Sequence, residues 1–129
     1  MSSQNENKKK ILIIEDESIL QKALRNILEE QSYEVVSALN GEAGLNMAIS
    51  QIPDLVILDL ILPKKEGFEV LEELKKNSKT KKIPVIILTN IEKIEDMEKA
   101  FKLGATAYLI KTQYKLEELL KKVNGILNQ

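Results

Sequence analysis

The chain has 129 residues, of which 43% are hydrophobic and 30% charged, and its 19 Lys and Arg residues nearly balance 20 Asp and Glu residues. This length suits one domain with a substantial core, and the net charge of −1 gives no general attraction to nucleic acid or anionic lipid. Because cysteine and histidine are both absent, disulfides, thiolate or histidine metal sites and histidine-dependent catalysis are excluded, and any bound metal is expected to have oxygen ligands.

Five short apolar runs recur along the chain and predict β-strands. The runs at 11–14, 54–58 and 83–88 are nearly continuous and rich in β-branched residues, which is typical of strands covered on both faces in a parallel sheet. The runs at 34–39 and 105–110 are mixed in polarity, as expected for edge strands.

Between and after these runs, apolar residues recur at helical spacing, which predicts five helices. The stripes that mark these helices are Ile19, Leu20, Ala23, Leu24, Ile27 and Leu28; Leu45, Ala48 and Ile49; Phe68, Leu71 and Leu74; Ile94, Met97, Ala100 and Phe101; and Leu116, Leu119, Leu120, Val123 and Leu127. The first two stripes are expected to face the core, while Phe101 would suit either the core or a surface exposed toward a partner. Ser18 and Gln21 fit a capping box that would begin the first helix just after Asp16. Asn40 is expected to begin the second helix, and Gly104 to end the fourth with a positive φ.

The strand–helix alternation, repeated five times, predicts an α/β fold with a single-domain doubly wound (βα)5 parallel five-stranded sheet and helices on both faces. We expect residues 9–129 to form this domain and residues 1–8 to be a flexible polar tail. No apolar stretch approaches the length that spans a bilayer, and no hydrophobic region of signal-peptide length follows the start. These features predict a cytoplasmic protein without membrane insertion.

Polar residues follow four of the five predicted strands, at the sheet edge where ligands bind in such folds. They are Glu15, Asp16, Glu17, Asp59, Thr89, Asn90 and Lys111. Carboxylates that meet at adjacent strand ends repel one another unless a cation joins them, and oxygen-only ligands suit Mg²⁺. The alternative interpretation is a set of solvated loop charges, which we expect for Glu17 but not for Asp16 with Asp59.

The other residues at this edge each have a structural alternative when taken singly. Lys111 is expected to reach an oxyanion, although a lone lysine after a strand is usually solvated. Thr89 would equally suit a helix cap, and Tyr108 would more often be plain packing. The functional interpretation therefore depends on the joint occurrence of these residues with Asp59.

The segments that carry these residues also resemble a known family. They are ILIIEDES, DLVILDLILPKKEGFEVL, IPVIILTN and GATAYLIK. In this order and at these distances they resemble the receiver domain of two-component response regulators, especially the single-domain kind used in chemotaxis, over residues 9–127. The resemblance implies a flavodoxin-like strand order 2-1-3-4-5.

The resemblance also implies a phosphoryl-acceptor site around Asp59. Asp16 would hold Mg²⁺ directly and Glu15 through water, with Asp59 and the backbone carbonyl of Ile61 as further ligands. The implied catalytic and switching roles belong to a second group of residues. Thr89 and Lys111 would each contact a phosphoryl oxygen, the rotamer of Tyr108 would follow Thr89, and Pro63 and Gly67 would shape the loop after Asp59.

The implied function is that of a phosphoacceptor switch, not of an enzyme beyond its own phosphorylation and slow dephosphorylation. The donor would be a phosphohistidine on a sensor histidine kinase or a histidine phosphotransfer protein. Phosphorylation would switch a surface of the fourth helix, fifth strand and fifth helix toward an unknown downstream protein. A monomer or a phosphorylation-dependent dimer is expected. Direct nucleic-acid binding is not expected, because the sequence has no basic recognition helix and no output domain follows Gln129 in it.

Two alternatives bear on this function. A receiver-like protein-interaction module that works without phosphorylation stays open, because Thr112 and Asn90 depart from the family pattern. A metal-dependent phosphohydrolase would need a second catalytic aspartate two residues after Asp59, where Ile61 stands.

Several positions differ from the pattern of the family. Thr112 follows Lys111 where a proline with a cis bond is usual, and a cis bond without proline costs about 3–4 kcal/mol. We therefore expect a trans bond and weaker positioning of Lys111. Gly44 stands in a helix where alanine is frequent, at an expected cost of about 0.5–1 kcal/mol.

Hydrolysis of the phosphoryl group is also expected to be affected. Asn90 replaces a small residue and narrows access to Asp59, while Ile61 and Ile91 flank the path of the attacking water. Because both isoleucines are apolar and unable to orient a water molecule, we expect slow intrinsic dephosphorylation.

Overall fold

The computed structural model describes residues 8–128, so the predicted tail lies outside the described residues except for Lys8. Its elements, in chain order, are β1 (Lys10–Ile14), α2 (Ser18–Glu30), β2 (Glu34–Ala38), α3 (Gly41–Gln51), β3 (Leu55–Leu58), α4 (Gly67–Lys76), β4 (Val85–Thr89), α5 (Ile94–Lys102), β5 (Ala107–Ile110) and α6 (Leu116–Leu127). Every predicted apolar run overlaps a strand, and every predicted stripe lies in a helix, although Ile94, Phe101 and Leu116 within the stripes of α5 and α6 are exposed. None of the helices within the described range is long and apolar enough to cross a bilayer.

The five strands form one parallel sheet in the order β2-β1-β3-β4-β5, which confirms the predicted fold and strand order. The mixed strands β2 and β5 lie at the two edges, as their composition predicts. The three central strands are buried along their lengths apart from Lys10, the first residue of β1, because helices cover both faces of the sheet. Their near-continuous apolar sequences follow from this burial.

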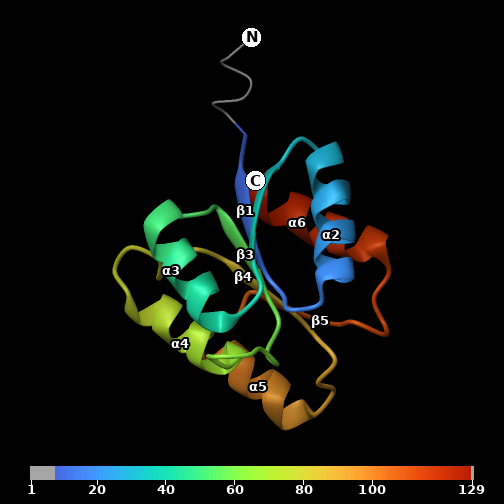
Figure 1. Ribbon diagram of the computed structural model, residues 1–129. Coiled ribbons are helices and arrows are strands. Elements are labelled where there is room, and N and C mark those ends of the chain that lie inside the picture. The colour runs from blue at the N-terminus through green and yellow to red at the C-terminus, as the bar shows by residue number, and fades with distance from the viewer. Residues whose placement is uncertain (1–7, 129) are drawn as a thin grey trace.

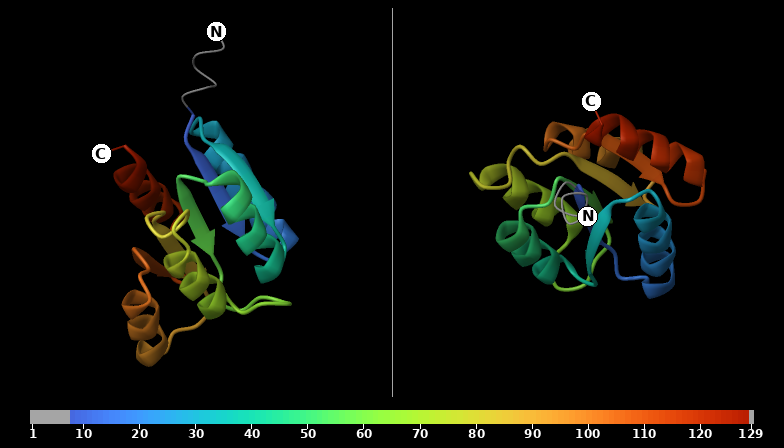
Figure 2. Two further views of the ribbon diagram at one scale, coloured as in Figure 1. Left: turned by 90° about the vertical axis from the view of Figure 1, so that its left-hand side faces the viewer. Right: turned by 90° about the horizontal axis from the view of Figure 1, so that it is seen from above.

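The helices divide into two layers, one on each face of the sheet (Figures 1 and 2). Helices α2 and α6 lie on one face, and α3, α4 and α5 lie on the other. Alternate residues of β1 serve the two layers: Ile11 and Ile13 pack with α2 and α6, whereas Leu12 and Ile14 pack with α3 and α4. Because successive side chains of a strand point to opposite faces of the sheet, β1 contributes to two separate hydrophobic cores.

The predicted capping box at the start of α2 is wrong. Helix α2 begins at Ser18, as expected, but its N-cap is Glu17 and no side chain caps it. Gln21 is buried, and its amide donates to the carbonyl oxygens of Glu15 and Ala38, both at 3.1 Å. Gln21 thus satisfies two carbonyls at the ends of β1 and β2, which a sequence-local capping rule does not consider.

The predicted core stripe of α2 is also partly wrong. Ile19 is 85% exposed and Ala23 is exposed, whereas Leu24 and Leu28 are buried together with Gln21. The side of α2 that carries Gln21 faces the strand ends. Ile19 and Ala23 lie on the opposite side of this helix and therefore face solvent.

Gly44 has a packing role in addition to its low helix propensity. A Cβ atom at this position would lie 2.6 Å from Cδ1 of Ile14 and 2.7 Å from two other atoms of that side chain. Glycine therefore lets α3 lie directly against β1. Two other local predictions are confirmed: the side chain of Asn40 accepts from the backbone N–H of Ala43 at 2.8 Å, and Gly104 has φ = 109° after α5.

Candidate functional site

The five parallel strands end at the same edge of the sheet (Figure 2). Three carboxylates meet at this carboxyl edge. Glu15 and Asp16 follow β1, and Asp59 follows the neighbouring β3. The N–H of Asp59 donates to the carbonyl of Ile14 at 3.1 Å, so the ladder between the strands extends to the acids. One oxygen from each carboxylate lies within 4.8 Å of the others, with Glu15 and Asp59 buried and Asp16 exposed.

Lys111 supplies the positive charge of this cluster from the end of β5. Its Nζ lies 2.8 Å from Oδ2 of Asp59, 3.0 Å from Oε1 of Glu15 and 2.9 Å from Oε1 of Glu17. Burial lowers the pKa of Lys111, but the hydrogen bonds to Asp59, Glu17 and Glu15 raise it more, so the net shift is upward. The ammonium therefore stays charged at neutral pH.

The peptide bond after Lys111 is trans, as predicted, since no cis bond occurs between residues 8 and 128. The expected weaker positioning of Lys111 is not seen, however, because Nζ still lies 2.8 Å from Asp59. The backbone N–H of Lys111 donates to the carbonyl of Thr89 at 2.8 Å, which holds the start of the loop against β4. A trans bond to Thr112 is thus compatible with placing the ammonium on Asp59.

Glu15 is the acid most affected by its surroundings. Burial, together with the nearby charge of Asp59, raises its pKa to about 7, against the opposing effects of the hydrogen bonds from the backbone N–H of Glu17 and from Lys111. A fully ionised cluster is therefore unfavourable without another cation. Three carboxylates with no nitrogen or sulfur donor match the preference of a hard divalent ion.

Thr89 and Tyr108 lie on adjacent strands next to this cluster. Thr89 ends β4 and is completely buried, and its Oγ1 accepts from the N–H of Ile91 at 3.5 Å. The hydroxyl of Tyr108 donates to the carbonyl of Ile91 at 2.8 Å, and its ring centroid lies 6.4 Å from that of Phe101. Burial, with the charges of Asp96 and Asp59, raises the pKa of Tyr108 to about 12, so this donor keeps its proton. Tyr108 therefore ties β5 to the loop after Thr89.

The loop after Asp59 is held close to the strand end. The N–H of Ile61 donates to Oδ1 of Asp59 at 3.2 Å, while the Ile61 side chain is 59% exposed. A Cβ atom at Gly67 would lie 2.3 Å from the carbonyl oxygen of Asp59, so only glycine permits this approach of α4. The carbonyl of Pro63 accepts from the N–H of Gly41 at 3.2 Å, which connects the loop to α3.

Glu17 is a residue of the site that the sequence interpretation missed. Its carboxylate contacts Lys111, although Glu17 was expected to be a solvated loop charge. Its position directly after Glu15 and Asp16 was the available signal, but sequence alone does not show which way a side chain after a strand points. A further contact joins two loops at this edge. Nε2 of Gln113 donates to Oε1 of Glu92 at 3.0 Å.

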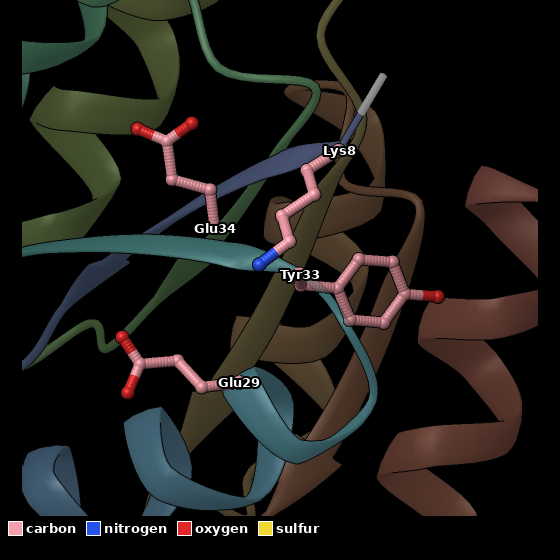
Figure 3. A pocket seen from close by; sticks show the side chains of 4 residues that line it. All are labelled: Lys8, Glu29, Tyr33 and Glu34. Carbon is pink, nitrogen blue, oxygen red and sulfur yellow. The ribbon is translucent and has the colours of Figure 1, made fainter. Parts of the chain in front are cut away.

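A separate hollow of about 330 Å³ lies at the opposite end of the sheet, lined by Lys8, Glu29, Tyr33 and Glu34 (Figure 3). Lys8 precedes β1 and Glu34 begins β2, so this hollow belongs to the amino end of the strands. Figure 3 shows the carboxylates of Glu29 and Glu34 pointing away from each other on opposite sides of β2. These side chains form no convergent site, and the acidic cluster stays the candidate.

Comparison with known proteins identifies the family and the fold. A family model described as the response regulator receiver domain matches residues 11–124. The chain is 38% identical over 120 residues to the DNA-binding dual master transcriptional regulator RpaA of Synechocystis sp. (strain ATCC 27184 / PCC 6803 / Kazusa), covering 93% of this chain and 49% of that protein. The chain spans about half the length of the curated relatives it matches.

Two solved structures extend the similarity to three dimensions. The CheY-like response regulator receiver domain protein from Methanospirillum hungatei JF-1 has a TM-score of 0.88 and 30% identity, covering 95% of this chain and 95% of that chain. The Mn²⁺-bound form of response regulator Rcp1 has a TM-score of 0.75 and 35% identity, covering 92% and 91% of the two chains. The chain therefore belongs to the response regulator receiver domain family of two-component systems, and its acidic cluster lies at the carboxyl edge of the receiver fold.

Proposed function

We propose that Asp59 accepts a phosphoryl group from a phosphohistidine on a sensor histidine kinase or a histidine phosphotransfer protein. The observation that carries this proposal is the placement of Asp59, a buried carboxylate at the end of β3 with an ammonium 2.8 Å from its Oδ2. A buried carboxylate beside other acids is unfavourable unless cations compensate for it. A phosphoacceptor site that works with a metal ion explains why this arrangement is present.

We propose Mg²⁺ as the ion, held by Asp16, Glu15, Asp59 and the backbone carbonyl of Ile61. The acidic cluster supports this assignment, as does the similarity to Rcp1, which was solved in a Mn²⁺-bound form. Mg²⁺ prefers oxygen ligands and, when bound, neutralises negative charge on a phosphoryl group during transfer.

Side chains of this chain carry out the phosphoryl transfer. A carboxylate oxygen of Asp59 forms a bond to phosphorus as the bond from phosphorus to the histidine nitrogen breaks, and the imidazole leaves with that electron pair. Lys111 stabilises charge on the phosphoryl oxygens, and Thr89 donates a hydrogen bond to one of them. The protein is a phosphoacceptor that promotes only its own phosphorylation and slow dephosphorylation.

We further propose that phosphorylation switches the surface formed by α5, β5 and α6 toward a downstream protein. Three large apolar side chains are exposed on these helices: Ile94 at 69%, Phe101 at 48% and Leu116 at 39%. Tyr108 connects this surface to the site, because its ring lies beside Phe101 and its hydroxyl contacts the loop after Thr89. Movement of Thr89 toward a phosphoryl group would change that loop.

Incubation with acetyl phosphate and Mg²⁺, followed by intact-mass measurement, tests the phosphoacceptor function. We expect one phosphoryl group on the wild-type protein, none on Asp59→Asn, and loss of the label when EDTA replaces Mg²⁺. An unlabelled wild-type protein would favour the alternative, a receiver-like interaction module that works without phosphorylation.

Beryllofluoride, which mimics a phosphoryl group, tests the switching surface. Backbone amide shifts in NMR spectra should change in α5, β5 and α6 of the wild type and stay unchanged in Asp59→Asn. Changes confined to the loops around Asp59 would contradict the proposed surface.

A further inference from the structure

Lys111 contacts three acids, and only one of them lies outside the donor set proposed for Mg²⁺. Glu15 and Asp59 belong to that set, whereas Glu17 reaches Nζ of Lys111 at 2.9 Å from outside it. When the ion is bound, the carboxylates of Glu15 and Asp59 share their charge with it. Phosphorylation then converts the Asp59 carboxylate into an acyl phosphate. The contact with Glu17 is the one acid contact of Lys111 in this structure that neither event uses.

The backbone of Glu17 is held firmly, which makes its side chain a suitable anchor. Its N–H donates to Oε2 of Glu15 at 3.0 Å, and its carbonyl accepts from the N–H of Gln21 at 2.9 Å. Glu17 is also the N-cap residue of α2. The side chain therefore extends from a fixed helix start, although it is itself 57% exposed.

We propose that Glu17 is a positioning residue that keeps the ammonium of Lys111 over Asp59 during metal binding and phosphoryl transfer. This inference rests on the proposed phosphoacceptor function. An ammonium has three N–H donors, so Lys111 has donors for Glu17 and for a phosphoryl oxygen at the same time. Glu17 is thus a fixed partner of Lys111 and not a competitor of the phosphoryl group.

A simple charge effect of Glu17 predicts the opposite result. If Glu17 only added negative charge at the mouth of the site, its removal would favour an anionic donor and raise the phosphorylation rate, most strongly at low salt. A positioning role predicts a slower reaction, with the loss in the maximal rate and little change in the donor concentration for half-maximal rate.

Phosphorylation kinetics with acetyl phosphate and Mg²⁺ distinguish these two roles. We expect Glu17→Ala to lower the maximal rate on the order of tenfold, because small misplacement of a catalytic group is costly. Glu17→Gln, which retains an acceptor without the charge, should lose less. The matched control is Glu30→Ala, which removes an exposed glutamate from the other end of α2 and should behave as wild type. In a Lys111→Ala background, Glu17→Ala should cause no further loss, because Glu17 acts through that lysine.

The ammonium of Lys111 provides a second readout that does not depend on phosphorylation. In Mg²⁺-saturated protein, the ¹⁵N signal of its Nζ should stay sharp in wild type and Glu30→Ala, and broaden through faster proton exchange in Glu17→Ala. An unchanged ammonium signal, a rate increase in Glu17→Ala, or equal losses with and without Lys111 would overturn the inference. Absence of label on the wild-type protein would instead refute the phosphoacceptor function, and the ammonium measurement would still decide the role of Glu17.

Discussion

Glu15 and Lys111 contact each other at the carboxyl edge of the sheet, and the pKa of each is raised for a different reason. Lys111 stays charged because its hydrogen bonds to acids outweigh the effect of burial. Burial dominates for Glu15 and raises its pKa to about 7, despite a hydrogen bond from the same ammonium. The cluster therefore has one positive charge that persists at neutral pH and one acid that is partly protonated there. Ligand binding at this site should be coupled to protons.

The first prediction concerns that coupling. A carboxylate must lose its proton to hold a metal ion, so Mg²⁺ affinity should rise with pH up to about 7 and then level off, since the pKa of Glu15 is raised to about 7. Well below that pKa, each pH unit should change the affinity by up to about tenfold. Titration calorimetry at pH 7 in buffers of different ionisation enthalpy should show proton release. Heats that do not depend on the buffer would contradict the prediction, and Glu15→Gln should release fewer protons.

The second prediction concerns the lifetime of the phosphoryl group. Ile61 and Ile91 offer no side-chain hydrogen bond to an attacking water, and Ile61 is largely exposed beside Asp59. Ile91→Glu or Ile61→Asn should therefore speed dephosphorylation by on the order of tenfold, because a polar group orients the water and lowers the barrier. The decay of labelled protein after removal of the donor measures the rate, with Ile19→Glu on the exposed face of α2 as the control. Rates within about twofold of wild type in both variants would rule out this explanation.

Among the helices and strands, the approach of α3 to β1 shows how packing overrides helix propensity. Gly44 is a poor helix former, but a Cβ atom there would lie 2.6 Å from Ile14. Gly125 also lies in a helix, α6, and a Cβ atom there would meet nothing within 4 Å. The two glycines are therefore a matched pair with the same backbone entropy and different surroundings.

The third prediction uses this pair. Gly44→Ala should lower the free energy of unfolding by about 1–3 kcal/mol, because overpacking outweighs the gain in helix propensity. Gly125→Ala should raise the free energy of unfolding by roughly 0.5–1 kcal/mol. Urea denaturation at constant pH measures both values. Stabilisation by both substitutions would show that Ile14 moves aside without cost.

For the fold as a unit, the acidic cluster joins segments that are distant in the sequence. Glu15 and Asp59 end neighbouring strands, and Lys111 brings the edge strand β5 to the same point. The pKa of Glu15 is raised in the folded protein from 4.5 to about 7, so its contribution to stability is full below pH 4.5 and is lost as pH rises through about 7. A metal ion at this point should restore that loss.

The fourth prediction is that Mg²⁺ stabilises the entire domain. An ion that binds only the folded state at 100 times its Kd adds about 2.7 kcal/mol to the free energy of unfolding, and the rise in Tm should be larger at pH 8 than at pH 6. Scanning calorimetry with Mg²⁺ or EDTA measures the effect, and Asp59→Ala should abolish most of it. An equal rise in wild type and Asp59→Ala would assign the effect to general screening of the surface charges.

Much of the architecture follows from residue patterns that are local in the sequence. The near-continuous run at 11–14 has only one environment that suits it, a strand covered on both faces, and the alternation with helical stripes leaves a parallel sheet as the solution. The acids and Lys111 could be assigned to one edge because parallel strands all end on the same side. Asp59 was recognisable because an acid at the end of a buried strand needs a partner.

Details that depend on side-chain direction and on contacts between distant segments were decided only by the tertiary structure. Gln21 turns inward because the carbonyls at the ends of β1 and β2 need donors, and this exposes Ile19. Gly44 is required by a side chain on another element, and Glu17 meets an ammonium 94 positions away in the sequence. The hydrophobic periodicity of each segment indicates which of its side chains face the core and which face solvent. The partner of each polar group appears only when distant segments come together, because hydrogen bonds and steric contacts act over a few ångströms in space.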